Sequence, residues 1–255
     1  MGIPKTIRVI PRLDVKGPNV IKGVHLEALR VVGDPEDMAK RYYEGGADEL
    51  IYMDIVASLY GRNNLLDIVE KASERIFIPL TAGGGIRSIE DIKRILRAGA
   101  DKVAINTYAV KNPAFITKAA HAFGAQCIVG SIEAKRVGEG RWEAYTDNGR
   151  VETGLDAVTW AQKLVDLGAG ELLVTSIDQE GTAKGYDVEL VARIAPHVPV
   201  PVIACGGAGK PKDMVEVITA GCADAVSAAH IFHYNKHSIQ SVKEALRNNS
   251  IPVRI

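Results

Sequence analysis

Acidic side chains end several of the apolar runs in this sequence. Asp14 closes the run VIPRLD, and Glu133 closes the run CIVGSIE. A carboxyl group can take or give a proton in a reaction, and two opposed carboxyl groups can do both on one carbon framework. Asp54 and Asp178 also follow apolar runs, where an Asp can equally be the cap of the next helix. The sequence therefore predicts Asp14 and Glu133 as an acid–base pair.

Lys22 lies in the segment VKGPNVIKG, which follows the first of these runs. A lysine in such a segment can neutralise charge that develops during a reaction, or close over a bound ligand. It can equally be a solvated surface side chain. The spacing of the residues leaves both interpretations open.

Two glycine-rich segments have the pattern of a phosphate site. They are GGGIRSIED, which begins at Gly83, and CGGAGKPKDM, which begins at Cys205. Each follows an apolar run and leads into a helical pattern. Glycine lets backbone N–H groups approach an anion, and the start of a helix adds partial positive charge. One such loop is a weak signal, but two related loops indicate two phosphates at opposite ends of one long substrate.

The chain repeats itself. Four blocks recur in the same order at a nearly constant offset, as between Gly84 and Gly206. A repeat of this kind is the first feature that a fold prediction must explain. Within each half, short β-branched runs alternate with helical patterns. In the first half the expected strands are 7–15, 48–56, 78–83 and 102–106, and the expected helices include 34–46, 88–100 and 112–124.

Nearly continuous apolar strands are typical of a parallel sheet that is covered on both faces. Strand–helix units repeated in two halves predict an α/β fold, a single (β/α)8 TIM barrel. We expect one domain over 1–255, with half-barrels at about 1–119 and 120–245. An open doubly wound sheet is the alternative, but it gives no reason for the repeat. Active sites of such barrels lie at the carboxyl ends of the strands, where the candidate residues stand.

Composition excludes several classes of function. The 31 Lys and Arg residues balance 31 Asp and Glu residues, so no net field attracts nucleic acid or an anionic membrane. No stretch approaches the length of an apolar membrane span, and the N-terminus lacks the apolar core of a signal peptide. Three widely separated cysteines fit a reducing compartment, so we expect a cytoplasmic protein.

His230, His233 and His237 have the spacing of ligands on one face of a helix. No carboxylate or cysteine accompanies them in the sequence, as zinc sites commonly require. We therefore predict no metal site, and no other residue pattern points to a cofactor.

The segments that carry these residues resemble one protein family. They are IPRLDVKGPNVIKG, DELIYMDIVAS, TAGGGI, GADKVAINT, EAKR, GAGELLVTSID, GTAKGYD and IACGGAGK. Together they make the chain similar, over its whole length, to the cyclase subunits of imidazole glycerol phosphate synthase. The resemblance implies a lyase of histidine biosynthesis that takes ammonia from a glutaminase subunit, with which it forms a heterodimer.

The resemblance also implies the reaction and its residues. The substrate is a bisphosphorylated ribulosylformimino aminoimidazole carboxamide ribonucleotide, and the products are imidazole glycerol phosphate and aminoimidazole carboxamide ribonucleotide. Asp14 and Glu133 are implied as the catalytic carboxyl groups, with Lys22 as the catalytic lysine. The residues implied at one phosphate are Gly85, Asn106 and Thr107. Those implied at the other are Gly181, Gly207 and Ala229, with His230 in place of a serine.

The opposite end of the predicted barrel matches the family as well. In the family, an Arg, two Glu and a Lys surround the ammonia entrance at the amino ends of strands. The residues at the matching positions are Arg8, Glu49, Lys102 and Glu171, with Asp101 beside them where the glutaminase would dock. Without the resemblance, these would be ordinary solvated charges. With it, they predict a partner that supplies ammonia.

The predicted mouth departs from the family pattern. Arg12 stands where the family usually has Cys, and Glu133 and Glu180 stand where it has Asp. A displacement of about 1 Å at a reacting centre can cost roughly a hundredfold in rate. The departures also fit a paralogue that channels ammonia to an enzyme amidating a surface-polysaccharide sugar. A phosphosugar isomerase of the sister barrel family is a further alternative, although it needs no ammonia. The cyclase is our leading hypothesis.

Overall fold

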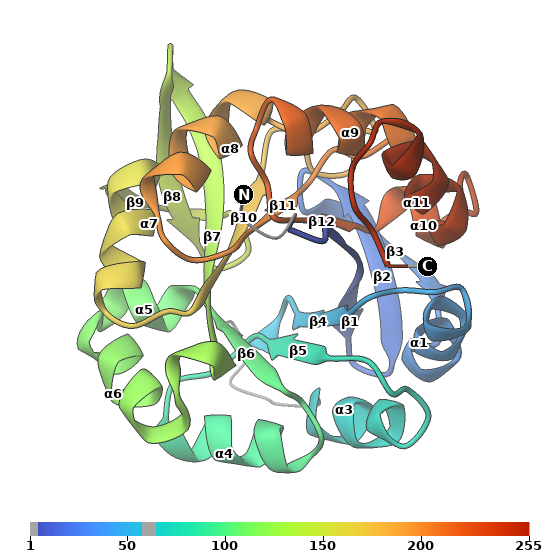
Figure 1. Cartoon of the computed structure of the whole chain (residues 1–255). Coiled ribbons are helices and arrows are strands. Elements are labelled where there is room, and N and C mark those ends of the chain that lie inside the picture. Colours follow the sequence, from blue (N-terminus) through green and yellow to red (C-terminus); the bar gives the residue numbers. More distant parts are fainter. Residues whose placement is uncertain (1–4, 58–64, 255) are drawn as a thin grey trace.

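The computed structural model describes residues 5–57 and 65–254. Eight parallel strands form a closed barrel, with the helices on its outside (Figure 1). The barrel closes because β10 pairs in parallel with both β11 and β7. The predicted (β/α)8 fold is confirmed. The barrel strands are β1 (Arg8–Lys16), β4 (Leu50–Asp54), β5 (Leu80–Gly83), β6 (Lys102–Ile105), β7 (Ile128–Gly138), β10 (Glu171–Ser176), β11 (Val202–Cys205) and β12 (Ala225–Ala228).

Several helices begin at a capping side chain. Asp34 accepts hydrogen bonds from the first turn of α1, and Ser88 forms a reciprocal capping box with Asp91 at the start of α4. In the part of the chain that the structure describes, the α-helices are α1 (Pro35–Glu44), α3 (Leu65–Ser73), α4 (Ile89–Arg97), α5 (Thr107–Lys111), α6 (Ala114–Phe123), α7 (Ala157–Asp166), α8 (Val188–Ile194), α9 (Pro211–Thr219), α10 (His230–His233) and α11 (Ile239–Asn248). Two short 3₁₀ turns are η1 (Ala125–Cys127) and η2 (Ala195–His197). The predicted joint between the halves, at residue 119, falls inside α6; that the halves superpose stays a prediction.

Two antiparallel excursions extend the sheet beyond the barrel. After β1 the chain forms a hairpin of β2 (Asn19–Val24) and β3 (Glu27–Gly33), and β2 carries Lys22. After β7 it forms β8 (Arg141–Thr146) and β9 (Val151–Asp156). Asn148 and Gly149 lie in the turn between these two strands with positive φ angles, a conformation that an Asn-Gly pair favours. Both excursions leave from the carboxyl ends of barrel strands and therefore lie at the mouth.

The apolar core has two main parts because side chains alternate along each strand. The outward-facing residues, such as Val9, Leu13 and Leu172, pack with the helices in one large cluster. The inward-facing residues, such as Ile10 and Leu173, fill the middle of the barrel in a second cluster. The same alternation decides which charged residues point inside. Along β1, Arg8, Ile10, Arg12 and Asp14 share the inward face, from the lower opening to the mouth.

Candidate functional site

The predicted acid–base residues lie at the mouth of the barrel. Glu133 is in register with Thr175 of the neighbouring β10. Both Asp14 and Arg12 of β1 act electrostatically on its carboxyl group, so the three charged side chains share one site. All three are more than nine-tenths buried. The structure therefore brings Asp14 and Glu133 together, and adds Arg12 to them.

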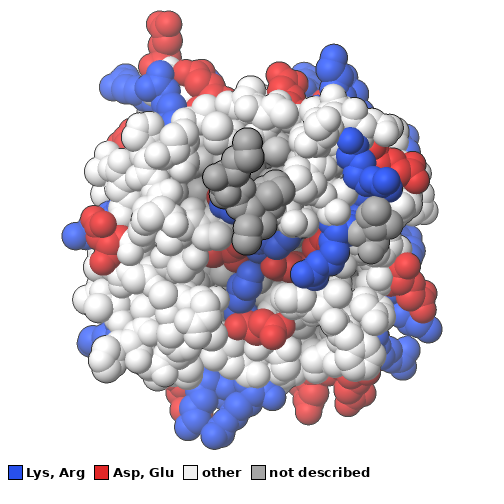
Figure 2. All heavy atoms as spheres, viewed as in Figure 1, with Lys and Arg blue, Asp and Glu red and all other residues white. Residues whose placement is uncertain are grey.

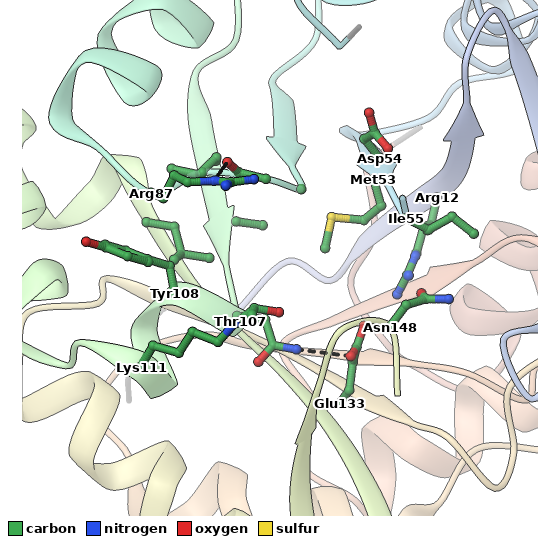
Figure 3. Close-up of a pocket in the computed structure, with 16 residues that line it drawn as sticks. Arg12, Met53, Asp54, Ile55, Arg87, Thr107, Tyr108, Lys111, Glu133 and Asn148 are labelled. Atoms are coloured by element: carbon green, nitrogen blue, oxygen red, sulfur yellow. Dashed lines mark hydrogen bonds between the residues drawn. The ribbon is translucent and has the colours of Figure 1, made fainter. Parts of the chain in front are cut away.

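Glu133 is buried but well hydrogen-bonded. Its Oε2 accepts from Asn106 Nδ2 at 3.0 Å (Figure 3) and from the backbone N–H of Gly149 at 2.8 Å. Burial raises the pKa of Glu133 to about 7, although Arg12 and the Gly149 N–H both work in the opposite direction. At neutral pH the side chain is therefore found in both its acid and its carboxylate form, which suits a group that gives and takes protons.

Asp14 is paired with a buried cation. Its Oδ1 accepts a hydrogen bond from Arg12 Nε at 2.7 Å. The guanidinium also donates through Nη1 to Thr175 Oγ1 at 3.1 Å and contacts Cys205 Sγ at 3.6 Å. Burial opposes the charge on Arg12, but the carboxylate of Asp14 raises its pKa well above the usual value. Arg12 thus holds Asp14 in place from inside the barrel.

A cavity of about 260 Å³ opens above these groups (Figure 3). Glu133 and Arg12 lie in its wall, together with three residues predicted at one phosphate, Gly85, Asn106 and Thr107. Gly84 and Gly85 have positive φ angles, and a Cβ on Gly84 would lie 2.2 Å from the carbonyl oxygen of Asp54. Only glycine fits at this position. The first glycine-rich segment thus forms part of the wall of a cavity that can hold a small ligand.

Two cations in the same wall were missed by the sequence analysis. Arg87 follows the glycines and donates to the carbonyl oxygens of Gly85 and Ala57 at 3.3 and 3.2 Å. Lys111 lies one helical turn after Thr107, and its Nζ is 4.0 Å from a carboxylate oxygen of Asp147. Figure 3 shows both side chains at the cavity, on the side away from Arg12. The signals that could have identified them are the place of Arg87 within GGGIRSIED and that of Lys111 four residues after Thr107.

The second glycine-rich segment has different surroundings. A Cβ on Gly207 would lie 2.0 Å from the carbonyl oxygen of Gly185, and one on Gly181 would lie 2.3 Å from that of Gly23. Backbone segments therefore pack directly on these glycines. Glu180 Oε2 approaches to within 3.2 Å of a Cβ placed on Gly206. A carboxylate residue thus lies beside each segment: Glu180 at the second and Asp54, which lines the cavity next to Gly84, at the first.

Ala229 and His230 stand at the start of the short helix α10, which follows β12 at the mouth. The ring of His230 packs on Tyr234 at 4.7 Å between centroids, and burial lowers the pKa of His230. His237 lies beyond the end of α10, so the three histidines do not share one helix as their spacing suggested. His233 is buried, with Nδ1 2.6 Å from the hydroxyl of Tyr42. The described residues contain no group of three potential metal ligands.

Lys22 is not a surface side chain. It lies on β2, is almost completely buried, and forms an ion pair with Glu180. Burial works against its charge, but Glu180 raises the pKa of Lys22. The hairpin that carries Lys22 reaches across the mouth to the segment after β10. The N–H of His25 donates there to the carbonyl oxygen of Glu180 at 2.7 Å. Lys22 is therefore next to the second glycine-rich segment rather than in the wall of the cavity.

The four charges predicted at the lower opening form a closed ring. Arg8 donates to Glu49 at 2.7 Å and to Glu171 at 2.5 Å, and Lys102 donates to the same two carboxylates at 3.1 and 2.8 Å. The ring occupies the end of the barrel at which the strands begin. Asp101 is tied to its own sheet, since its Oδ2 accepts from the N–H of Leu80 at 2.8 Å. Sequence positions far apart thus meet at one opening.

Comparison with known proteins adds to this geometry. A family model described as Histidine biosynthesis protein matches residues 8–238, a range that contains every candidate residue of the mouth and of the ring. The imidazole glycerol phosphate synthase subunit HisF of Legionella pneumophila is 63% identical over 204 residues, which cover 80% of this chain and 96% of that protein. Within the described residues, no helix is long and apolar enough to cross a membrane.

Proposed function

We propose that this chain, which belongs to the histidine biosynthesis protein family, is the cyclase subunit of imidazole glycerol phosphate synthase. In this reaction, ammonia and the bisphosphorylated ribulosylformimino aminoimidazole carboxamide ribonucleotide give imidazole glycerol phosphate and aminoimidazole carboxamide ribonucleotide. The observation that carries the proposal within the molecule is Glu133, a buried carboxyl group with a pKa of about 7 in the wall of a cavity at the barrel mouth.

Glu133 and Asp14 divide the proton transfers in this proposal. Glu133 changes between acid and carboxylate at neutral pH, so it can protonate a leaving oxygen and accept a proton from nitrogen. Asp14 stays paired with Arg12 and completes the charge pattern around the reacting atoms. The cavity walls limit the access of water to the intermediates, which protects an imine from hydrolysis.

The two phosphates of the substrate would bind at the two glycine-rich segments. At the first, Gly85, Asn106 and Thr107 border the cavity, and Arg87 and Lys111 add positive charge. Guanidinium and ammonium groups are the usual partners of phosphate. The residues proposed for the second phosphate are Gly181, Gly207, Ala229 and His230. Lys22 would exchange Glu180 for this phosphate when substrate binds.

A glutaminase subunit would dock on the face at which the strands begin. Figure 2 shows this face: charged side chains gather at its centre, and a broad uncharged surface surrounds them. Phe77, which precedes β5, is 79% exposed and packs edge-on against Tyr43. Exposed aromatic side chains are frequent anchors of protein interfaces. The ring of Arg8, Glu49, Lys102 and Glu171 would then admit ammonia to the barrel.

The partner proposal is tested by charge reversal on this face. Lys102→Glu and Asp101→Lys should weaken association with the glutaminase by about tenfold or more, since each places like charges together. Lys163→Glu, an exposed reversal on the outer helix α7, is the matched control. Association is measured by calorimetry, and coupling as imidazole product formed per glutamine hydrolysed. If both face variants match the control, the glutaminase does not dock there.

The cyclase proposal is tested with the purified chain, saturating ammonium salt and authentic substrate. Formation of imidazole glycerol phosphate without any glutaminase is the expected result, because free ammonia replaces the partner's product. An intact substrate after long incubation, with correctly folded protein, would overturn the proposal. The three free cysteines of the described chain are compatible with a reducing cytoplasm, where we place the reaction.

One observation favours a second candidate function. The carboxylate of Glu180 lies beside Gly206 and is already paired with Lys22, so the lysine proposed for the second phosphate is already neutralised. A paralogue that only channels ammonia to a sugar-amidating enzyme would need no second phosphate. Calorimetry with imidazole glycerol phosphate and with aminoimidazole carboxamide ribonucleotide separates the two functions. The cyclase binds both products, whereas a channelling subunit binds neither but still accelerates amidation by its partner.

A further inference from the structure

Arg12 lies in the barrel interior, directly below the mouth. Its side chain follows Arg8 and Ile10 on the inward face of β1, and only 2% of its surface is exposed. Figure 3 shows it pointing toward the side of the cavity that carries Asn148 and Glu133. A group that enters at the Arg8 ring and travels through the barrel therefore reaches Arg12 before it reaches the cavity.

The hydrogen bonds of Arg12 leave one nitrogen for a ligand. Nε donates to Asp14, and Nη1 donates to Thr175 and contacts Cys205. Among residues 5–57 and 65–254, none accepts a hydrogen bond from Nη2, and Arg12 forms part of the cavity wall. Nη2 is not one of the fully buried polar atoms without a partner, so it is open to the cavity, where a ligand oxygen can accept its hydrogen bond. A guanidinium fixed by two other bonds is also well oriented for a ligand oxygen.

The neighbours of this nitrogen fit an oxygen that gains negative charge. Glu133, which shares the cavity wall, is a proton donor in its acid form. The interior of the barrel below Arg12 is apolar, formed by residues such as Ile10, Ile51 and Val129. A cation in such surroundings stabilises developing charge more strongly than it would in water. A ligand oxygen next to Arg12 Nη2 would thus have a fixed hydrogen-bond donor, a nearby proton donor and the apolar barrel interior below it.

We propose that Arg12 donates through Nη2 to the ketone oxygen of the ribulosyl group while ammonia attacks the carbonyl carbon. The inference rests on the proposed cyclase function. The nitrogen lone pair forms the C–N bond, and the C=O π pair moves to oxygen as an alkoxide. Glu133 protonates that oxygen and then accepts a proton from nitrogen. Glu133 then protonates the hydroxyl group, water leaves, and the iminium nitrogen returns its proton to Glu133, so that ammonia and one carbonyl group give one imine and one water.

A merely structural role of Arg12 predicts different behaviour. Arg12 could serve only to neutralise Asp14, and a lysine at the position would then serve nearly as well. Lysine keeps the positive charge near Asp14 but lacks the planar fork that reaches Asp14 and a ligand at once. Arg12→Lys therefore separates the two roles. Arg136→Lys, on the solvent side of the β7 excursion, is the matched control.

The first experiment measures turnover with saturating ammonium. We expect Arg12→Lys to lower kcat by about a hundredfold or more, as removal of an oxyanion donor does, with a KM close to that of the wild type. Free guanidinium ion should restore part of the activity of Arg12→Ala, a rescue that serves also if the lysine variant folds poorly. Unchanged kcat in Arg12→Lys, or a change in KM alone, would overturn the proposal.

The second experiment does not depend on turnover. Ribulose 5-phosphate and ribitol 5-phosphate differ at the carbon that carries the ketone oxygen, and their binding is compared by calorimetry. The wild type should prefer the ketone by about tenfold, the value of one charge-assisted hydrogen bond, and Arg12→Lys should lose this preference. Equal affinities in the wild type would sink the role of Arg12. If the preference is found but no imidazole product forms, the cyclase function fails instead.

Discussion

The two glycine-rich segments have the same chemistry in the sequence but different surroundings in the structure. The first, around Gly84 and Gly85, borders a cavity with Arg87 and Lys111 in its wall. The second, around Gly206 and Gly207, is packed against the backbone of Gly185 and faces the carboxylate of Glu180. A repeated sequence thus gives two similar glycine-rich segments, while the side chains that cross the mouth decide what each segment can bind.

The difference has a structural origin in the hairpin after β1. This hairpin carries Lys22 across the mouth toward the second half, where Lys22 pairs with Glu180. The excursion after β7 instead brings Gly149 and Asn148 to Glu133 and the cavity. The two insertions stand at equivalent places in the repeat but pack in different ways. They make the mouth asymmetric although the sequence of the barrel repeats in its two halves.

The largest effect should come from the paired carboxyl groups, one in each half. Glu133→Gln and Asp14→Asn should each lower ammonium-dependent kcat by about a hundred- to ten-thousandfold, since each removes a proton-transfer or charge-pairing group. Glu133→Asp should keep much more activity than Glu133→Gln. Steady-state assays with ammonium chloride measure the difference. Near-normal turnover in either amide variant would show that the repeat does not place a catalytic pair.

The second-largest effect should show whether the two glycine-rich segments contribute equally to substrate binding. Arg87→Ala should raise the KM for substrate by about tenfold with little change in kcat, because it removes a charge-assisted contact to one phosphate. Lys210→Ala is the matched change beside the second segment, where the lysine side chain is 65% exposed. It should change KM by less than about twofold. Equal effects would mean that both segments present their cations to ligand in the same way.

A smaller effect is expected when the carboxylate beside the second segment is removed. Glu180→Gln should strengthen binding of inorganic phosphate at that segment by about fivefold, since one unit of like charge a few ångströms away is lost. Binding at the first segment should not change. Titration calorimetry, with Arg87→Ala as the background in which the first site is weakened, isolates the second. Weaker phosphate binding in Glu180→Gln would mean that Glu180 holds Lys22 in the position from which it binds the phosphate.

The smallest effect concerns the pH dependence of stability. Burial raises the folded-state pKa of Glu133 to about 7, above its ordinary value near 4.5. Between these values the folded protein holds more protons than the unfolded chain, so the stability linked to Glu133 is full below pH 4.5 and declines as the pH rises to 7. Glu133→Gln should lack this decline. Urea unfolding at pH 5 and pH 8 compares the two proteins, and parallel changes would contradict the buried, protonatable state.

The sequence indicated the barrel and the candidate residues for a clear physical reason. Strand–helix alternation and continuous apolar strands follow from local side-chain periodicity, and the carboxyl ends of parallel strands always meet at one face. Asp14 and Glu133 could therefore be placed at one mouth without coordinates. Arg8 and Lys102 could likewise be placed at the opposite opening, since they precede strands.

Contacts between elements that are distant in the chain were decided only by the tertiary structure. The ion pair of Lys22 with Glu180 and the bond from Gly149 to Glu133 depend on how two hairpins fold over the mouth. The inward direction of Arg12 follows from the alternation of side chains along β1. The hydrogen bonds from its guanidinium group to Asp14 and Thr175 depend on the closure of the barrel. Local sequence fixes which face a side chain takes; only the closed barrel brings its partner within hydrogen-bond distance.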